Sequence, residues 1–296
     1  MKVLVSGGTG LVGRYIVEAL LSSGYDVTVG GRSSPPAAFF SRPVQFRPLS
    51  LDPYVDPIEA FDDAYVFVHA AFDHEPGKYR GGEGNDPARF RRLNLDGTVR
   101  LFEAARRAGV RRVVFLSSRA VYDGIAPGVP LVETAQLRPT SLYGQIKLLC
   151  EQVLADMSGP GFVGTSLRLT GVYGDLRPNK WDDLFHDYLA GRTVAARAGS
   201  EVNGRDVGQA VRLMLEGEAA RICGEVFNVS DRVTDTREIL SHLQAATGCV
   251  HPLPAAADRQ AVAEMATDKI RALGWTPGGR DRLEETVRRL AATLGQ

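Results

Sequence analysis

The sequence predicts an α/β fold, in which a doubly wound parallel sheet is followed by a smaller C-terminal lobe. Two observations carry this prediction. Short apolar runs alternate with stretches of helical period over the first two-thirds of the chain, and a glycine-rich turn follows the first run. Strands that are apolar throughout and are separated by helices are typical of a parallel sheet covered on both faces. Right-handed crossovers between such strands give a doubly wound sheet.

The individual elements follow from the same patterns in chain order. The apolar run 3–6 predicts a buried strand. Apolar residues then recur on one helical face over 11–23, and Gly24 ends this helix. Further strands are predicted at residues 26–30, 64–70, 112–117 and 165–169, and further helices at residues 95–108 and 141–157.

After Gly171 the alternation becomes less regular. Helical patterns occupy four stretches and an apolar strand pattern occupies one. The predicted helices are residues 181–189, 206–217, 236–246 and 281–294, and the predicted strand is 226–229. We therefore expect a smaller lobe over residues 171–296, with the strand at 226–229 allowing the chain to cross back to the sheet.

Composition excludes several classes of protein. The 296 residues carry 35 basic and 35 acidic side chains, whereas a nucleic-acid-binding protein is usually markedly basic. We expect no membrane span, because no apolar run reaches about 18 residues. The first residues enter a strand pattern at once, so we expect no signal peptide and a cytoplasmic location. The three cysteines and five histidines lack the spacing of metal ligands, so no metal site is expected.

The glycine-rich turn SGGTGLVG predicts a dinucleotide site. Gly7 permits the tight turn, Gly10 lets backbone approach a pyrophosphate, and Gly13 lets the helix pack on the strand. The helix that follows offers unpaired N–H groups and a positive dipole end to the anion. Thr9, Leu11 and Val12 complete the turn as candidate cofactor-binding residues. The alternative is a plain glycine-rich turn.

The end of the second predicted strand bears on the choice of cofactor. A site that prefers NAD usually has an acid here to hold the ribose hydroxyls, whereas a 2′-phosphate needs a cation. The sequence has Gly31 and Arg32 and no acid close by in the chain. We therefore expect NADP to be preferred, with NAD possible. Asp52 is a candidate acceptor for the adenine amino group, or an ordinary loop aspartate.

Tyr143 and Lys147 suggest catalytic chemistry. Four residues apart on a helix, they lie on one face. A tyrosine with a pKa near 10 works at pH 7 only if its phenolate is stabilised by about 4 kcal/mol, and a neighbouring ammonium supplies part of that. Ser118 ends a predicted central strand, where its hydroxyl would point into the crevice in which such sheets bind ligands. Taken alone, a tyrosine and a lysine at this spacing are most often a solvated helix face.

At this point the chain resembles a known family, the extended short-chain dehydrogenase/reductases of the NAD(P)-dependent epimerase/dehydratase type. The resemblance is dense over residues 1–175 and thin beyond. Its motifs are GGTGLVG (7–13), HAA (69–71), NLDGT (94–98), VVFLSSRAVY (113–122), PTSLYGQIK (139–147), LRLTGVYG (167–174), GEVFNVSD (224–231) and LGWTP (273–277).

The resemblance implies a Rossmann fold, with residues 1–170 as the NAD(P)-binding domain and residues 171–296 as a smaller substrate-binding lobe. It implies Ser118 as the catalytic serine, Tyr143 as the acid/base and Lys147 as the residue that holds the nicotinamide ribose. Asn94 would brace the cofactor-side helix, and Ala70, Ala71 and Thr170 would line the cofactor. Relatives commonly form homodimers through the helix with Tyr143 and the preceding long helix.

Several positions depart from the family pattern. Arg119 and Ala120 stand where 4,6-dehydratases have an acidic pair, so dehydration is not expected. Gly171 replaces an asparagine that is usual in members acting on sugar nucleotides. Gly199 stands where an arginine usually binds the diphosphate, although Arg197 could substitute. These departures favour a smaller polar substrate, such as a free sugar acid.

Our interpretation from the sequence is an NADP-preferring oxidoreductase that interconverts a secondary alcohol and a ketone on a sugar-like or small polar substrate by hydride transfer. The first alternative is an epimerase of a sugar or nucleotide sugar that uses the same hydride step transiently. The second is a non-catalytic dinucleotide-sensing protein.

The glycine-rich and charged segment 72–92 is far longer than a usual connection between a strand and a helix. It predicts either a disordered surface loop or a mobile flap beside the site.

Overall fold

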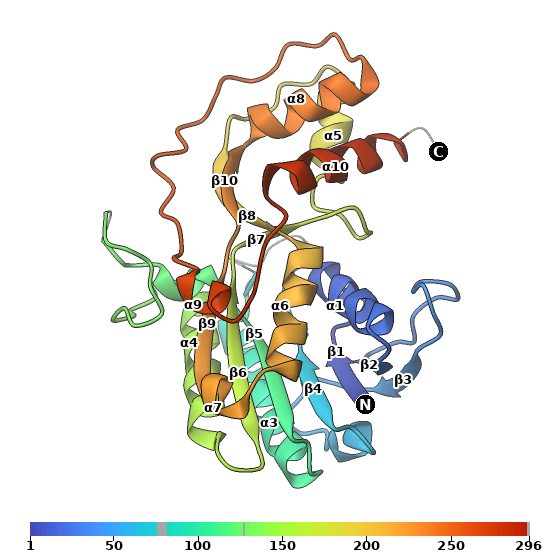
Figure 1. The fold of residues 1–296 in the computed structure, drawn as a ribbon, viewed down its shortest axis with the longest axis vertical. Helices are drawn as coiled ribbons and strands as arrows, with labels where there is room; N and C mark the ends of the chain where they lie inside the picture. Colours follow the sequence, from blue (N-terminus) through green and yellow to red (C-terminus); the bar gives the residue numbers. More distant parts are fainter. Residues whose placement is uncertain (76–81, 127, 295–296) are drawn as a thin grey trace.

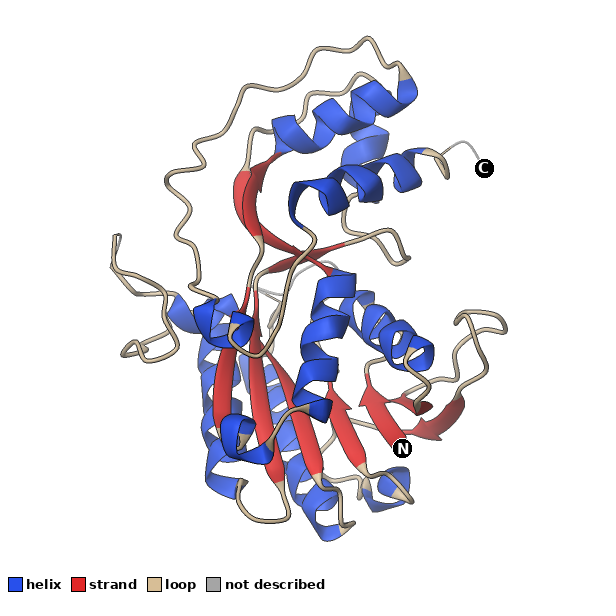
Figure 2. Cartoon of the chain, viewed as in Figure 1, coloured by secondary structure: helices blue, strands red, loops and turns tan. Residues whose placement is uncertain are grey.

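The computed structural model describes residues 1–75, 82–126 and 128–294, and it confirms the predicted doubly wound fold (Figures 1 and 2). Seven strands form one sheet in the order β3-β2-β1-β4-β5-β6-β9, and every neighbouring pair is parallel. Its strands are β1 (Lys2–Ser6), β2 (Asp26–Gly31), β3 (Gln45–Pro48), β4 (Val66–His69), β5 (Arg112–Ser118), β6 (Val163–Leu169) and β9 (Glu225–Val229).

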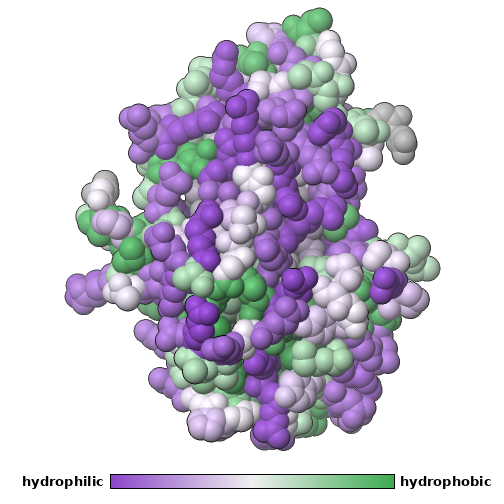
Figure 3. Space-filling view, in the orientation of Figure 1, coloured by the Kyte–Doolittle hydropathy of each residue, from purple (hydrophilic) through white to green (hydrophobic). Residues whose placement is uncertain are grey.

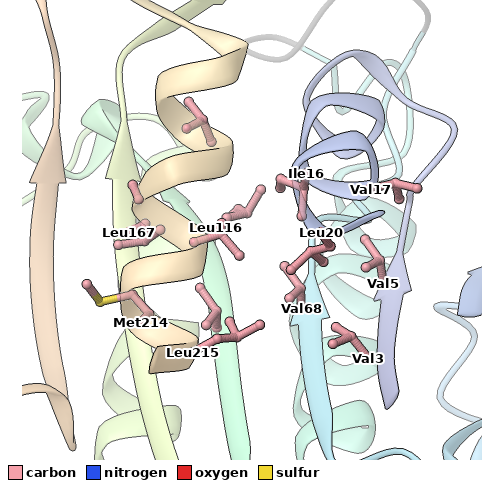
Figure 4. Close-up of a cluster of buried hydrophobic side chains, with 14 of the residues drawn as sticks. Val3, Val5, Ile16, Val17, Leu20, Val68, Leu116, Leu167, Met214 and Leu215 are labelled. Carbon is pink, nitrogen blue, oxygen red and sulfur yellow. The ribbon is translucent and has the colours of Figure 1, made fainter. Parts of the chain in front are cut away.

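Helices cover both faces of this sheet, as its apolar strands require. On one face α1 (Leu11–Ser22) lies beside α6 (Gly204–Glu216), and their apolar sides pack onto the strands. Figure 4 shows Leu20 of α1 and Leu215 of α6 in the same buried apolar cluster as Val3, Val5 and Val68 of the strands. The other face is covered by α3 (Gly97–Arg107) and α4 (Leu142–Met157), which enclose a second core rich in phenylalanine.

A smaller lobe lies beyond the carboxyl ends of the strands (Figure 1). It contains a three-stranded sheet and three helices that enclose a third apolar core. The strands, in the order β10-β8-β7, are β7 (Gly171–Tyr173), β8 (Ala198–Asn203) and β10 (Arg232–Asp235). The helices are α5 (Asp182–Leu189), α8 (Thr236–Thr247) and α10 (Gly279–Ala291). The short helices α7 (Ala219–Ile222) and α9 (Asp268–Arg271) lie near β9.

The chain passes between the lobe and the main sheet several times. It leaves β6 for β7 and β8, returns through α6 to β9, and leaves again for β10. The strand pattern at 226–229 corresponds to β9, which joins the main sheet beside β6. Strand β7 has only three residues, and β8 and β10 carry polar residues, so no apolar run in the sequence predicts these strands.

The segment 72–92 contains structure that the sequence pattern did not indicate. Helix α2 (Pro87–Arg91) is capped by Asp86, whose side chain accepts from the Arg89 amide at 2.8 Å. A π-helical turn (Arg92–Asp96) then leads into α3. Therefore α3 begins two residues later than predicted. Residues 76–81 of this segment lie outside the described residues.

The face of the molecule in Figure 3 is mostly hydrophilic, with small apolar areas between charged groups. No helix among the described residues is both long enough and apolar enough to span a membrane.

Candidate active site

The glycine-rich turn between β1 and α1 is closely packed against its surroundings. Gly7 has φ +68°, and a Cβ there would lie 2.7 Å from the Ala71 amide nitrogen. A Cβ on Gly13 would lie 2.0 Å from the carbonyl oxygen of Gly7. Gly10 caps α1 without a side-chain hydrogen bond to the first helical amides. The turn is therefore a backbone cradle, closed on one side by Ala70 and Ala71, of the kind that accepts a pyrophosphate.

Arg32 directly follows β2, and its side chain is 87% exposed. Its Nη1 is 3.8 Å from a carboxylate oxygen of Asp73. The expectation that Arg32 has no carboxylate nearby is wrong, because the fold brings Asp73 beside it from the segment that follows β4. Asp52 lies in the loop after β3, where its carboxylate accepts from the Tyr54 amide at 3.1 Å.

Ser118 and Tyr143 come from neighbouring elements. Ser118 is the last residue of β5, and its Oγ accepts from the Ala120 amide at 3.2 Å. Helix α4 begins after Ser141, whose Oγ accepts from the Gly144 amide at 3.1 Å. A Cβ on Gly144 would lie 2.4 Å from the Ala120 carbonyl oxygen. The glycine after Tyr143 therefore lets α4 approach the segment that follows Ser118, a role that the sequence analysis missed.

Lys147 lies one turn further along α4 and is 5% exposed. Its Nζ donates to the Leu116 carbonyl oxygen of β5 at 2.7 Å. Burial lowers the pKa of this ammonium to about 8, while Cys150 and Glu151 act in the opposite direction. The lysine is therefore held against the strand that ends at Ser118, with its charge only partly compensated.

His69 and Asn94 support the site from behind. His69 Nδ1 is 2.7 Å from Ser6 Oγ and its Nε2 is 2.9 Å from Thr98 Oγ1, and burial lowers its pKa to about 3. A neutral imidazole thus links β1, β4 and α3. The Asn94 amide group accepts from the Asp73 amide and donates to the Asp73 carbonyl, both at 2.7 Å. Asn94 therefore fixes the start of the segment 72–92.

A buried polar network that was not predicted from the sequence connects β5, β6, β9 and α4 next to Ser118. Arg168 of β6 is bonded to the Glu151 carboxylate, and its Nη1 also donates to Tyr122 Oη at 2.8 Å. Ser117 Oγ donates to the same carboxylate. Tyr122 Oη in turn donates to Asn228 Oδ1 of β9 at 2.8 Å. The sequence feature that could have indicated this network is a charged residue within an otherwise apolar pattern, Arg168 in β6 and Glu151 in α4.

Thr170 and Gly171 extend the site beyond β6. Ser118 is paired in register with Leu169, so Thr170 and Gly171 follow β6 beside the end of β5. Thr170 Oγ1 donates to the Ser200 carbonyl at 2.6 Å. A Cβ on Gly171 would lie 2.7 Å from a carboxylate oxygen of Glu201, and Glu201 forms an ion pair with Lys180. A carboxylate therefore fills the space beside Gly171.

Among residues 1–75, 82–126 and 128–294, no group of three or more His, Cys, Asp and Glu side chains is arranged to hold a metal ion.

Both the sequence and the fold of the chain match known proteins. Residues 3–230 match the model of the NAD dependent epimerase/dehydratase family. Among curated relatives, the UDP-glucose 4-epimerase of Bacillus subtilis is 33% identical over 168 residues, which are 53% of this chain and 48% of the relative. The D-erythronate dehydrogenase of Cupriavidus necator is 34% identical over 211 residues, 64% of this chain and 60% of the relative. The match thus spans about half of the relatives' own length.

Solved structures match along nearly the whole chain. The UDP-glucose 4-epimerase of Thermotoga maritima with UDP-glucose has a TM-score of 0.81 at 25% identity, covering 99% of this chain and 98% of that one. MoeE5 in complex with UDP-glucuronic acid and NAD has a TM-score of 0.81 at 26% identity, covering 99% and 100%. Together with the family model, these matches show that the chain belongs to the NAD-dependent epimerase/dehydratase family and is an enzyme of the extended short-chain dehydrogenase/reductase type.

Proposed function

We propose that the enzyme epimerises a secondary alcohol centre of a sugar-like substrate, by oxidising it to a ketone and returning the hydride to the opposite face. The observation that carries the proposal is the position of Ser118 at the end of β5 beside a helix that presents Tyr143 and Lys147 one turn apart. The epimerases among its relatives favour this outcome over the net oxidoreduction that the sequence interpretation placed first. The dinucleotide-sensing alternative has no such support.

The residues present fit a nicotinamide dinucleotide. Gly7 and Gly13 have no room for a side chain, and the turn they form opens α1, so its amides face an anion. Gly10, Ala70 and Ala71 complete the cradle. When bound, the dinucleotide supplies the hydride acceptor and donor. We propose that residues 1–170 hold it and that residues 171–296 contribute most of the substrate contacts.

Each polar side chain of the site then has a part in the reaction. The Tyr143 phenolate takes the proton of the substrate hydroxyl and gives it back when the ketone is reduced. Ser118 Oγ donates to the same substrate oxygen. The Lys147 ammonium stabilises the phenolate through its charge and would donate to the nicotinamide ribose of a bound dinucleotide. Asn94 holds the backbone of Asp73 next to this pair.

For the cofactor we propose NAD in place of the NADP preference expected from Gly31 and Arg32. Structural neighbours are complexes with NAD. In addition, the Asp73 carboxylate lies 3.8 Å from Arg32 and competes with a 2′-phosphate for its charge. Thr9, Leu11, Val12, Asp52 and Thr170 remain candidate cofactor contacts.

A second candidate is a dehydrogenase of a small sugar acid. The specific observation in its favour is the Glu201 carboxylate of β8, which fills the space beside Gly171 and leaves no room there for the asparagine side chain usual in members that act on sugar nucleotides. One curated relative is a D-erythronate dehydrogenase.

One experiment separates the two candidates. The purified enzyme is incubated with NAD and either UDP-glucose or D-erythronate. Formation of UDP-galactose without accumulation of NADH supports the epimerase, whereas stoichiometric NADH from D-erythronate supports the dehydrogenase. If neither substrate is converted, a panel of free and nucleotide-linked sugars and sugar acids follows, and lack of turnover on the whole panel contradicts both.

We also propose that two copies pair through α3 and α4. A hollow of about 360 Å³ lies on these helices and is lined by apolar groups that include Val99, Leu149 and Val153. Leu149 is 38% exposed. Sedimentation of the protein with Leu149→Glu against the unmodified chain tests the pairing.

A further inference from the structure

Phe72, the first residue of the segment 72–92, contacts both Tyr143 and Lys147. Its ring centroid is 4.5 Å from Lys147 Nζ, and its ring meets that of Tyr143 edge-on at 5.0 Å. The ring centroid of Phe115 on β5 is 4.8 Å from the same Nζ. Two phenylalanine rings therefore contact the ammonium, and neither has a part in the proposed proton transfer.

The surroundings of Lys147 offer it few oxygen atoms. An ammonium carries three N–H donors. Among the described residues, its one hydrogen bond is to the Leu116 carbonyl oxygen at 2.7 Å. Because the residue is only 5% exposed, little water reaches the other donors. The electron-rich faces of aromatic rings attract a cation most strongly where water is excluded, and this attraction supplies part of the lost hydration.

The position of Phe72 is fixed by contacts on its other side. Asn94 holds both backbone groups of the next residue, Asp73, at 2.7 Å. Arg89 of α2 donates to the Asp73 carboxylate at 2.9 Å. Phe90, also of α2, packs against the Phe72 ring at 5.5 Å. The ring is thus anchored to α2 and the π-helical turn and is not a side chain resting on the surface.

From these contacts we propose that Phe72 is a positioning residue for the reaction: its ring holds the Lys147 ammonium in place and in the charged form, and thereby couples α2 to α4. This rests on the proposed function only for the catalytic role of Lys147. The aromatic ring, rather than mere bulk, is what the position requires.

Other titratable groups lie near the Lys147 ammonium on the elements packed around it. Tyr143, Cys150 and Glu151 face it along α4, and the neutral His69 lies on β4. On the segment 72–75, the Asp73 carboxylate is engaged by Arg89 and Arg32. All of these stay in place when only the Phe72 ring is changed, so a change in Lys147 can be assigned to the ring.

The test measures the charge of Lys147 directly. The chain has five lysines, so carbon-13 labelling at their ε positions gives few NMR signals, and Lys147→Met identifies the one of interest. In the cofactor-free protein, Phe72→Leu keeps the site dry but removes the ring, so the titration midpoint of Lys147 should fall by roughly half to one and a half pH units. Phe72→Met should act alike, and it replaces the leucine variant if that one fails to fold.

Two controls accompany these variants. Phe72→Tyr keeps an aromatic face and should leave the midpoint within about 0.2 pH units of the unmodified protein, since the ring quadrupole is retained. Phe90→Leu removes a ring that packs on Phe72 without touching Lys147, and its midpoint should stay closer to the unmodified value than that of Phe72→Leu. An unchanged or raised midpoint in both ring-deleting variants would overturn the proposal.

Activity gives a separate readout. If Lys147 acts as proposed, the alkaline limb of the activity profile shifts to lower pH in Phe72→Leu by the same amount as the NMR midpoint. A shifted midpoint with an unshifted activity profile would contradict the catalytic role of Lys147 and leave the inference about Phe72 standing. The two failures are therefore distinguishable.

Discussion

Arg168 and Glu151 form a bidentate ion pair in the interior, with side chains that are 4% and 3% exposed and an Nη2–Oε2 distance of 2.7 Å. Removing one partner of a buried pair leaves the other charge uncompensated, which typically costs about 3–5 kcal/mol. We expect Glu151→Ala to lower the free energy of unfolding by about this amount in urea titrations. The matched control is Asp187→Asn, which breaks an exposed pair with Arg192 and should change stability by less than about 1 kcal/mol. Equal effects of the two changes would contradict the importance of burial.

The proposed acid/base role of Tyr143 predicts a selective loss of turnover. Tyr143→Phe removes the transferable proton and keeps the ring that packs against Phe72. Turnover should fall by roughly 10²- to 10⁴-fold while the fold and cofactor affinity are retained. Tyr188→Phe in the small lobe, which loses a hydrogen bond to the His251 carbonyl, is the control and should keep its activity. Near-normal turnover of Tyr143→Phe would remove both proposed reactions.

Lys147 predicts a pH-dependent contribution to stability. Its pKa is lowered from 10.5 to about 8 in the folded protein. Between these values the unfolded chain binds more protons than the folded one, so the lysine makes the free energy of unfolding rise with pH across this window. In Lys147→Met this contribution is absent. Urea titrations near pH 7 and pH 10 should show the unmodified protein gaining stability relative to the variant as the pH rises. Parallel changes in the two proteins would place the lysine pKa near its ordinary value.

Cofactor choice is predicted to depend on the contact between Arg32 and Asp73. Asp73→Asn removes the competing carboxylate, so NADPH should bind several-fold more tightly relative to NADH than it does to the unmodified protein. Adding Arg32→Ala to this variant should abolish the gain. Quenching of protein fluorescence by each cofactor measures the affinities. If Asp73→Asn left the ratio unchanged, Arg32 would have no part in the choice.

The sequence was sufficient for the parts of the fold that depend on local pattern. The apolar runs at β1, β5 and β6 and the helical face of α1 lie within a few residues of their predicted ends. Ser118 was placed correctly at the end of β5, because a buried strand is followed there by a polar residue.

What the sequence did not indicate depends on contacts between distant residues. The carboxylate beside Arg32 comes from Asp73, and the cover on Lys147 comes from Phe72. Both pairs are far apart in the chain, and no periodicity marks them. Strand β8 was missed for a related reason: it is held by pairing with β7 and β10 and not by an apolar run of its own.

Strand β9 has a consequence for how the molecule can be divided. It pairs with β6 from Thr165↔Glu225 to Leu169↔Val229, although the chain between these strands has already passed through the small lobe. A fragment that stops at residue 170 would leave β6 as an exposed edge strand, and exposed edge strands pair with strands of other chains. We therefore expect this fragment to aggregate when expressed alone. A separate peptide with residues 225–229 would have no covalent link to fix its register against β6. The main sheet and the small lobe are therefore not separable modules, because a strand that follows part of the small lobe in the chain completes the main sheet.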